Sequence, residues 1–233
     1  MKVLILILTC NKNRGRLNKI KLRWISKIND CGYEYMCLYA NKNIVNTIHY
    51  ETMLCVNCND VYENLPLKLW LAYKYVLTYT DYDYIYKIDD DCLVNMSLLP
   101  RVLEVIRENK IDYYGNLAGG RNFDRDWHCG KCNDENLNMK LYEKEYKGDW
   151  CAGGIGYILS KKSLKILSEN ITEEYIKSEL YEDKAMGDML RANGILPSFE
   201  INNKWSFKVK KGNLEDLCCE MSNEINTVYD IYT

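Results

Sequence analysis

The stretch Tyr84-Ile-Tyr-Lys-Ile-Asp-Asp-Asp-Cys-Leu-Val-Asn95 joins an apolar run to three consecutive carboxylates. Residues 84–88 have the composition of a buried strand. Asp89, Asp90 and Asp91 would then lie at the carboxyl end of that strand, where open α/β sheets bind their ligands. Adjacent carboxylates repel one another unless a cation or basic groups neutralise them. The stretch predicts a site for a hard divalent metal, Mn²⁺ or Mg²⁺, with a solvated acidic turn as the alternative.

Strand and helix patterns alternate on both sides of this stretch. Apolar runs predict further strands at 3–8, 33–40, 53–56 and 155–159. Apolar residues at helical spacing predict helices at 17–28, 64–76, 97–106, 162–169 and 182–192. Ser97 is expected to cap the third helix and Gly194 to end the last. This order predicts one α/β domain over 1–233, with a mainly parallel central sheet flanked by helices and a long loop or lid at 121–147.

Composition limits the classes of partner. The chain has 233 residues and a formal net charge of −2, which gives no overall attraction to nucleic acid or to an anionic membrane. The first apolar run, 3–8, is too short to span a bilayer and is not followed by a small-residue cleavage site, so we expect no membrane span and a cytoplasmic location. A small polar ligand is the expected partner.

The chain contains 11 cysteines, an odd number without a secretory signal. Free thiols are therefore expected in place of a disulfide scaffold. Cys55 and Cys58 form one C-x-x-C pair, Cys129 and Cys132 form another, and His128 adjoins the second. Two such pairs are the pattern of a zinc site, but their separation is far longer than in a compact zinc ribbon. A zinc-dependent interaction module stays as an alternative.

Five segments resemble, in order, motifs of the beta-1,3-galactosyltransferase and Fringe-like families. Residues 84–95 resemble K-x-D-D-D-x-F-V-N, and 60–68 resemble D-x-Y-x-N-L-T-x-K with proline in place of threonine. Residues 16–24 resemble R-x-x-x-I-R-x-T-W with substitutions. Residues 150–160 resemble Y-C-x-G-x-G-Y-V-L-S, and 182–187 resemble E-D-V-x-x-G. Together the five segments span most of the chain.

The resemblance implies a GT-A fold and a metal-dependent inverting glycosyltransferase. Such an enzyme moves a hexose or N-acetylhexosamine from a UDP-sugar to a hydroxyl of a glycan or glycoprotein. Asp183 matches the catalytic base, a carboxylate that takes the acceptor proton. Asp91 and Asp89 match the metal ligands, and Asp89 also approaches the ribose. Glu182 and Asp183 begin a helix, where the helix dipole favours ionised carboxylates.

The remaining expected site residues fall into two groups. Those on the donor side are Thr9, Asn11, Arg14, Asp60, Lys87, Asp89 and Asp90. Those on the acceptor side are Trp150, Gly153, Gly154 and Glu182. Each has a structural alternative: the first three cap the sheet, Lys87 is solvated, Trp150 is a core aromatic, and the glycines permit tight packing.

One departure from the family pattern concerns the metal. The family supplies a histidine after the E-D helix, whereas both histidines here, His49 and His128, precede that helix. Asn202, Asn203 or water would have to replace it. The missing ligand motivates a second hypothesis, a catalytically inactive protein of the same fold that binds a sugar nucleotide or a glycan. Family members are usually membrane-anchored in the Golgi.

Overall fold

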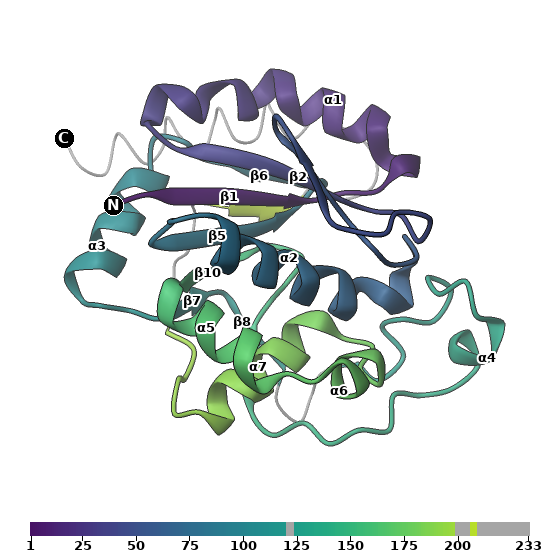
Figure 1. The fold of residues 1–233 in the computed structure, drawn as a ribbon. Coiled ribbons are helices and arrows are strands. Elements are labelled where there is room, and N and C mark those ends of the chain that lie inside the picture. Colours follow the sequence, from purple (N-terminus) through teal and green to yellow (C-terminus); the bar gives the residue numbers. More distant parts are fainter. Residues whose placement is uncertain (120–123, 199–205, 209–233) are drawn as a thin grey trace.

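The computed structural model describes residues 1–119, 124–198 and 206–208. Within these residues a seven-stranded sheet runs in the order β3-β4-β2-β1-β5-β10-β7, with helices on both faces (Figure 1). Strands β4, β2, β1 and β5 are parallel, and β10 inserts antiparallel between β5 and β7. Edge strand β3 is antiparallel to β4. The predicted α/β class with a mainly parallel sheet flanked by helices is confirmed.

The bounds of the elements follow the apolar patterns closely. The strands are β1 (Val3–Leu8), β2 (Glu34–Ala40), β3 (Ile48–Tyr50), β4 (Met53–Val56), β5 (Tyr84–Asp89), β6 (Cys92–Val94), β7 (Tyr113–Gly115), β8 (Leu117–Gly119), β9 (Asp149–Cys151), β10 (Tyr157–Ser160) and β11 (Ser206–Lys208). The α-helices are α1 (Arg14–Arg23), α2 (Leu65–Tyr79), α3 (Leu99–Glu108), α4 (Glu135–Asn138), α5 (Lys161–Asn170), α6 (Glu173–Lys177) and α7 (Glu182–Ala192). Strands β6 and β11, and β8 and β9, form two small antiparallel pairs.

Two apolar cores cover the two faces of the sheet. Successive strand residues point to opposite faces. Leu4, Leu6 and Leu8 of β1 accordingly belong to the core shared with α2, α5 and α7. Val3, Ile5 and Ile7 belong to the core shared with α1 and α3. Burial on both faces explains why β1 is apolar throughout instead of alternating.

Two predicted helices end or begin differently for reasons that the structure shows. Helix α1 ends at Arg23 because Trp24 leaves the helical conformation, with its indole Nε1 donating to the carbonyl of Cys92 at 3.0 Å, and two short 3-10 turns follow. The residue before α3 is Leu98, so Ser97 is not its cap. The carbonyl of Asn95 closes that turn instead, accepting from the backbone N–H groups of residues 98 and 99.

The predicted strand at 155–159 begins later, at Tyr157, because Gly156 lies in a turn with φ +98°. The described part of the 121–147 segment consists of turns, bends and irregular chain, with the one-turn helix α4. Its function as a lid stays a prediction. None of the helices in the described residues is long and apolar enough to cross a membrane.

Candidate functional site

The site lies where the carboxyl ends of β1 and β5 meet, with Leu8 paired to Asp89 in the parallel register. Asp90 turns back toward β1, and only 3% of it is exposed. Its carboxylate accepts from the hydroxyl of Thr9 at 2.7 Å and pairs with the guanidinium of Arg16 at 3.0 Å. Burial raises the pKa of Asp90, and the Thr9 and Arg16 contacts oppose the rise. The hydrogen bond between Thr9 and Asp90 thus joins the carboxyl ends of β1 and β5.

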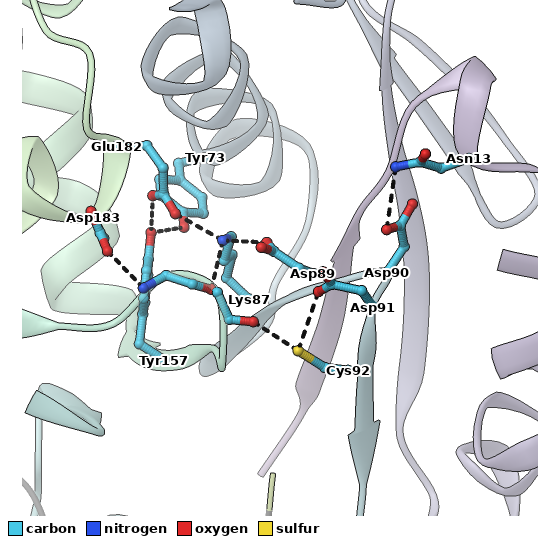
Figure 2. A network of polar contacts seen from close by, with 12 residues as sticks. Asn13, Tyr73, Lys87, Asp89, Asp90, Asp91, Cys92, Tyr157, Glu182 and Asp183 are labelled. Atoms are coloured by element: carbon cyan, nitrogen blue, oxygen red, sulfur yellow. Dashed lines mark hydrogen bonds and ion pairs between the residues drawn. The ribbon is translucent and has the colours of Figure 1, made fainter. Parts of the chain in front are cut away.

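Lys87 is buried at the centre of the site. Its ammonium donates to Oδ1 of Asp89 at 2.7 Å, to Oε1 of Glu182 at 2.8 Å and to the carbonyl of Gly153 at 2.9 Å (Figure 2). An ammonium has three N–H donors, so these contacts use all of them. Burial disfavours the charge, but the two carboxylates outweigh it and hold the pKa of Lys87 well above its ordinary value. The solvated alternative for Lys87 is wrong.

Glu182 is the acidic partner of Lys87 on α7. Its second oxygen accepts from the hydroxyl of Tyr157 at 2.9 Å, and that hydroxyl lies 2.9 Å from the hydroxyl of Tyr73 (Figure 2). Burial raises the pKa of Glu182 to about 7, with Lys87 lowering it and Asp183 raising it further. At this helix start burial outweighs the helix dipole, so the pKa of Glu182 and that of Asp183 are both raised.

Asp183 lies beside Glu182 and is held by backbone donors. Its Oδ2 accepts from the N–H of Gly153 and its Oδ1 from the N–H of Lys184, both at 2.8 Å. Burial raises the pKa of Asp183, and the N–H of Gly153 is the largest opposing contact. A Cβ at position 153 would collide with Oε1 of Glu182. The packing role expected for Gly153 is therefore present, since no other residue admits α7 so closely.

A cavity of about 370 Å³ contains the carboxylates on both sides of Lys87. We call it the β5–α7 cavity. Its lining residues are Leu8, Tyr62, Leu65, Lys87, Asp89, Ala118, Trp127, Ala152, Gly153, Gly154, Ile155, Leu180, Tyr181, Glu182 and Asp183. The structure thus brings together six of the expected residues, two from the donor group and Asp183 with three from the acceptor group.

Other expected donor residues lie around a second cavity of about 360 Å³, which Asn11 and Arg14 line. The side chain of Arg14 donates to Asn11 at 3.1 Å, and the N–H of Asn11 donates to Asp60 at 3.4 Å. The ammonium of Lys68 bridges Asp60 and the carbonyl of Thr9, both at 2.6 Å. Lys68 ends the 60–68 motif but is not among the expected site residues. Its signal is a lysine within the apolar pattern of α2, which favours a buried ion pair.

Trp150 does not lie in the β5–α7 cavity. It is fully buried, with an exposed fraction of 0%, so its indole cannot present a face to a sugar. A Cβ at Gly187 would approach Cβ of Trp150 to 2.5 Å, which shows how closely α7 packs against it. The acceptor-side expectation for Trp150 is corrected to its alternative, a core aromatic. Burial of the large apolar indole beneath α7 is the physical reason.

Asp91 has a partly exposed side chain, at 26%, like that of Asp89. Its carboxylate lies 3.8 Å from Arg16, and the thiol of Cys92 lies 3.7 Å from it (Figure 2). In residues 1–119, 124–198 and 206–208, no three His, Cys, Asp or Glu side chains form a group that could hold a metal. The suggested substitutes for the family histidine, Asn202 and Asn203, lie outside the described residues.

The cysteines and His128 bear on the zinc alternative. All nine cysteines in the described part of the chain are free thiols, as expected. His128 is buried, with one ring nitrogen 2.9 Å from the hydroxyl of Tyr181 and the other within 3.0 Å of the carbonyls of Leu137 and Lys140. Hydrogen bonds within the protein thus occupy both ring nitrogens. His128 ties the loop to the start of α7 instead of adjoining a cluster of thiolates.

Comparisons with known proteins identify the family of this chain. The family model described as Galactosyltransferase matches residues 40–198. UDP-GalNAc:beta-1,3-N-acetylgalactosaminyltransferase 2 of Xenopus laevis is 26% identical over 160 residues, covering 67% of this chain and 30% of the relative. The human protein of that name is 27% identical over 146 residues, covering 62% and 27%. The chain therefore spans about 30% of the length of the curated relatives it matches.

Among solved structures, galactosyltransferase LgtC in complex with donor and acceptor sugar analogs is 15% identical, with a TM-score of 0.47, over 84% of this chain and 73% of that one. The family match covers β4, β5, β10 and α7, and so includes Lys87, the acidic triplet and both carboxylates of α7. The chain belongs to the galactosyltransferase family.

Proposed function

We propose that this chain is a metal-dependent inverting glycosyltransferase that moves a sugar from a UDP-sugar to a hydroxyl of a glycan or glycoprotein. One observation carries the proposal. Asp183, the candidate base, and Asp89, a candidate donor-side residue, line the same cavity, with Lys87 between them. A carboxylate near a donor site, with backbone N–H groups fixing its orientation, meets the geometric demand on a general base.

The transfer step uses Asp183 as the proton acceptor. The acceptor hydroxyl oxygen forms a bond to the anomeric carbon as its proton passes to the carboxylate of Asp183. The bond from that carbon to the diphosphate oxygen breaks, and UDP leaves with the electron pair. Attack on the face opposite UDP inverts the anomeric configuration. The raised pKa of Asp183 makes it a stronger base than an ordinary aspartate.

The residues present fit a divalent metal that is shared with the substrate. Mg²⁺ and similar hard cations are commonly held by one or two carboxylates plus water and substrate phosphates. Asp91 and Asp89 would supply the carboxylate oxygens, and their exposed fractions of 26% leave both accessible. When bound, the metal offsets the negative charge that develops on the departing diphosphate. Asp90 instead holds β1 in place.

The donor sugar is best sought first among the donors that the relatives' names print. The curated relatives are named for UDP-GalNAc, so UDP-GalNAc is the first donor to test, followed by UDP-galactose, UDP-glucose and UDP-GlcNAc. Each is incubated with Mn²⁺ or with a chelator, and released UDP is measured. Manganese-dependent release identifies the donor, because water can replace the acceptor hydroxyl. UDP binding without release from any of the four would favour the inactive binding protein.

Asp91→Asn tests the metal ligand. An amide lacks the charge that a hard cation shares with a diphosphate, so we expect Mn²⁺ to strengthen UDP binding by the wild type and to have little effect on the variant. Calorimetric titration of UDP with and without Mn²⁺ measures both. Asp112→Asn is the matched control, because Asp112 is similarly exposed, at 24%, but pairs with Lys162 outside both cavities. Equal enhancement by Mn²⁺ in Asp91→Asn would exclude Asp91 as a ligand.

A further inference from the structure

The β5–α7 cavity has an aromatic side whose function the proposed chemistry leaves open. Tyr62, Trp127 and Tyr181 line it together with the carboxylates of Glu182 and Asp183. Trp127 differs from the other tryptophans whose side chains the structure describes. It is 48% exposed, whereas Trp24, Trp70 and Trp150 are at most 5% exposed. An indole that lines a cavity and is still half exposed offers apolar area to a ligand.

The cation of Lys131 helps to orient this ring. Its ammonium lies 3.7 Å from the ring centroid of Trp127 and 5.8 Å from that of Tyr62. A cation over an aromatic face is attracted by the ring quadrupole. Lys131 therefore links the loop that carries Trp127 to the residues before α2, which carry Tyr62.

The neighbouring residue, His128, fixes Trp127 relative to Asp183. His128 is 1% exposed, and its ring bonds the hydroxyl of Tyr181 at 2.9 Å. Tyr181 directly precedes α7, two positions before Asp183. His128 therefore anchors the loop that carries the indole to the start of α7, which carries the candidate base. Such preorganisation is what a ligand-orienting side chain needs, because little freedom is lost on binding.

The chemistry of an indole face selects its ligand. A pyranose ring carries hydroxyls at its rim, and its C–H groups gather on one face. A galactopyranoside presents the C–H groups of carbons 3, 4 and 5 on one side because its 4-hydroxyl is axial. That face matches a flat apolar surface, whereas the rim hydroxyls need polar partners such as carboxylates. The cavity offers both kinds of surface.

We propose that Trp127 is the platform on which the acceptor sugar lies, with the C–H face of a galactose-type pyranoside against the indole and a hydroxyl directed to Asp183. This inference rests on the proposed transfer and names the acceptor class for it. Trp127 takes the place in the site that the sequence suggested for Trp150.

The test measures binding, so it does not require turnover. Methyl β-galactopyranoside is titrated into the protein with UDP and Mn²⁺ present, and saturation-transfer NMR reports its affinity and which of its protons face the protein. We expect the protons on carbons 3, 4 and 5 to receive the strongest transfer. Trp127→Ala should weaken binding roughly threefold to tenfold, the range for one aromatic contact, and Trp127→Phe should recover most of it.

Tyr50→Ala is the matched control, because Tyr50 is also an exposed aromatic, at 65%, but lies on edge strand β3 away from the cavity. It should bind the glycoside as the wild type does, and thermal melting checks that all variants fold. No binding by the wild type, or equal binding by the wild type and Trp127→Ala, overturns the inference. Donor release by the wild type tests the proposed transfer separately, so the two failures are distinguishable.

Discussion

Asp183→Asn is expected to lower sugar transfer by roughly two to four orders of magnitude while UDP binding persists. The amide cannot take the acceptor proton, but it has nearly the same size as the carboxylate. In the structure Asp183 accepts from two backbone N–H groups, of Gly153 and Lys184. An asparagine oxygen can keep one of these bonds. The variant should therefore fold with a stability loss of about 1 kcal/mol, the net value of one hydrogen bond.

UDP affinity by calorimetry, transfer rate and thermal melting are measured together for this variant. Glu173→Gln is the matched control, because Glu173 also lies in the first turn of a helix, α6, but has a 64% exposed side chain outside the cavity. It should leave transfer unchanged. Near-normal turnover in folded Asp183→Asn would refute the catalytic role and transfer suspicion to Glu182.

The pH dependence of the wild type follows from the same residue. A general base acts in its ionised form, so transfer falls as pH drops through its pKa. Burial raises the pKa of Asp183, and the acid limb of the rate profile should therefore lie at higher pH than for an ordinary aspartate. A profile of kcat/KM against pH measures this limb. An acid limb near the ordinary aspartate value would contradict the assignment.

Lys87→Met is expected to give the largest loss of stability, about 3–5 kcal/mol at pH 8, as is typical when one partner of a buried ion pair is removed. The change leaves the carboxylates of Asp89 and Glu182 without the ammonium that contacts both. It also leaves the carbonyl of Gly153 without its lysine donor. Chemical denaturation measures the loss. Lys162→Met is the control, because its ion pair with Asp112 is exposed and should contribute at most about 1 kcal/mol.

The sign of the pH effect distinguishes this explanation from a simple packing defect. Lys87 lowers the pKa of Glu182, which is about 7 with the lysine present, so the variant raises that pKa further. A carboxyl whose pKa is raised on folding costs stability as pH rises from its unfolded value through its folded one. The destabilisation should therefore be smaller at pH 6 than at pH 8. A loss that is the same at both would indicate packing alone.

The central sheet could be predicted because its strands are long apolar runs with clear boundaries. The residues at 3–8 and 53–56 are strands with the predicted bounds. Ser97 failed as a cap because the signal for a helix start is local, and Asn95 closes the same turn in its place. The loop at 121–147 has no periodicity, so its one-turn helix α4 could not be predicted.

Within the candidate site, the segments that carry the carboxylates could be predicted from sequence motifs. The burial and the contacts of those carboxylates could not. In the sequence, Lys87 lies near the end of a strand, which is typical of a solvated lysine. Only the fold brings Glu182, 95 residues later, into contact with it. The same packing raises the pKa of Glu182. Trp150 and Trp127 are indistinguishable as residue types, and burial alone separates them. Such properties depend on tertiary contacts, which a single sequence does not display.

The place of β10 in the sheet has a consequence for the order of folding. This strand enters between β5 and β7, both of which precede it in the chain. Until residues 157–160 are synthesised, β5 and β7 each have an edge without this partner, and such edges invite pairing with other chains. Helix α7 follows β10. Lys87 therefore meets Asp89 two residues along the chain but meets Glu182 only 95 residues later. Contacts so distant in sequence form slowly. A nascent chain that stalls before β10 would carry the acidic triplet but lack both the strand that pairs with β5 and the carboxylates of α7, so an aggregation-prone edge would precede the site.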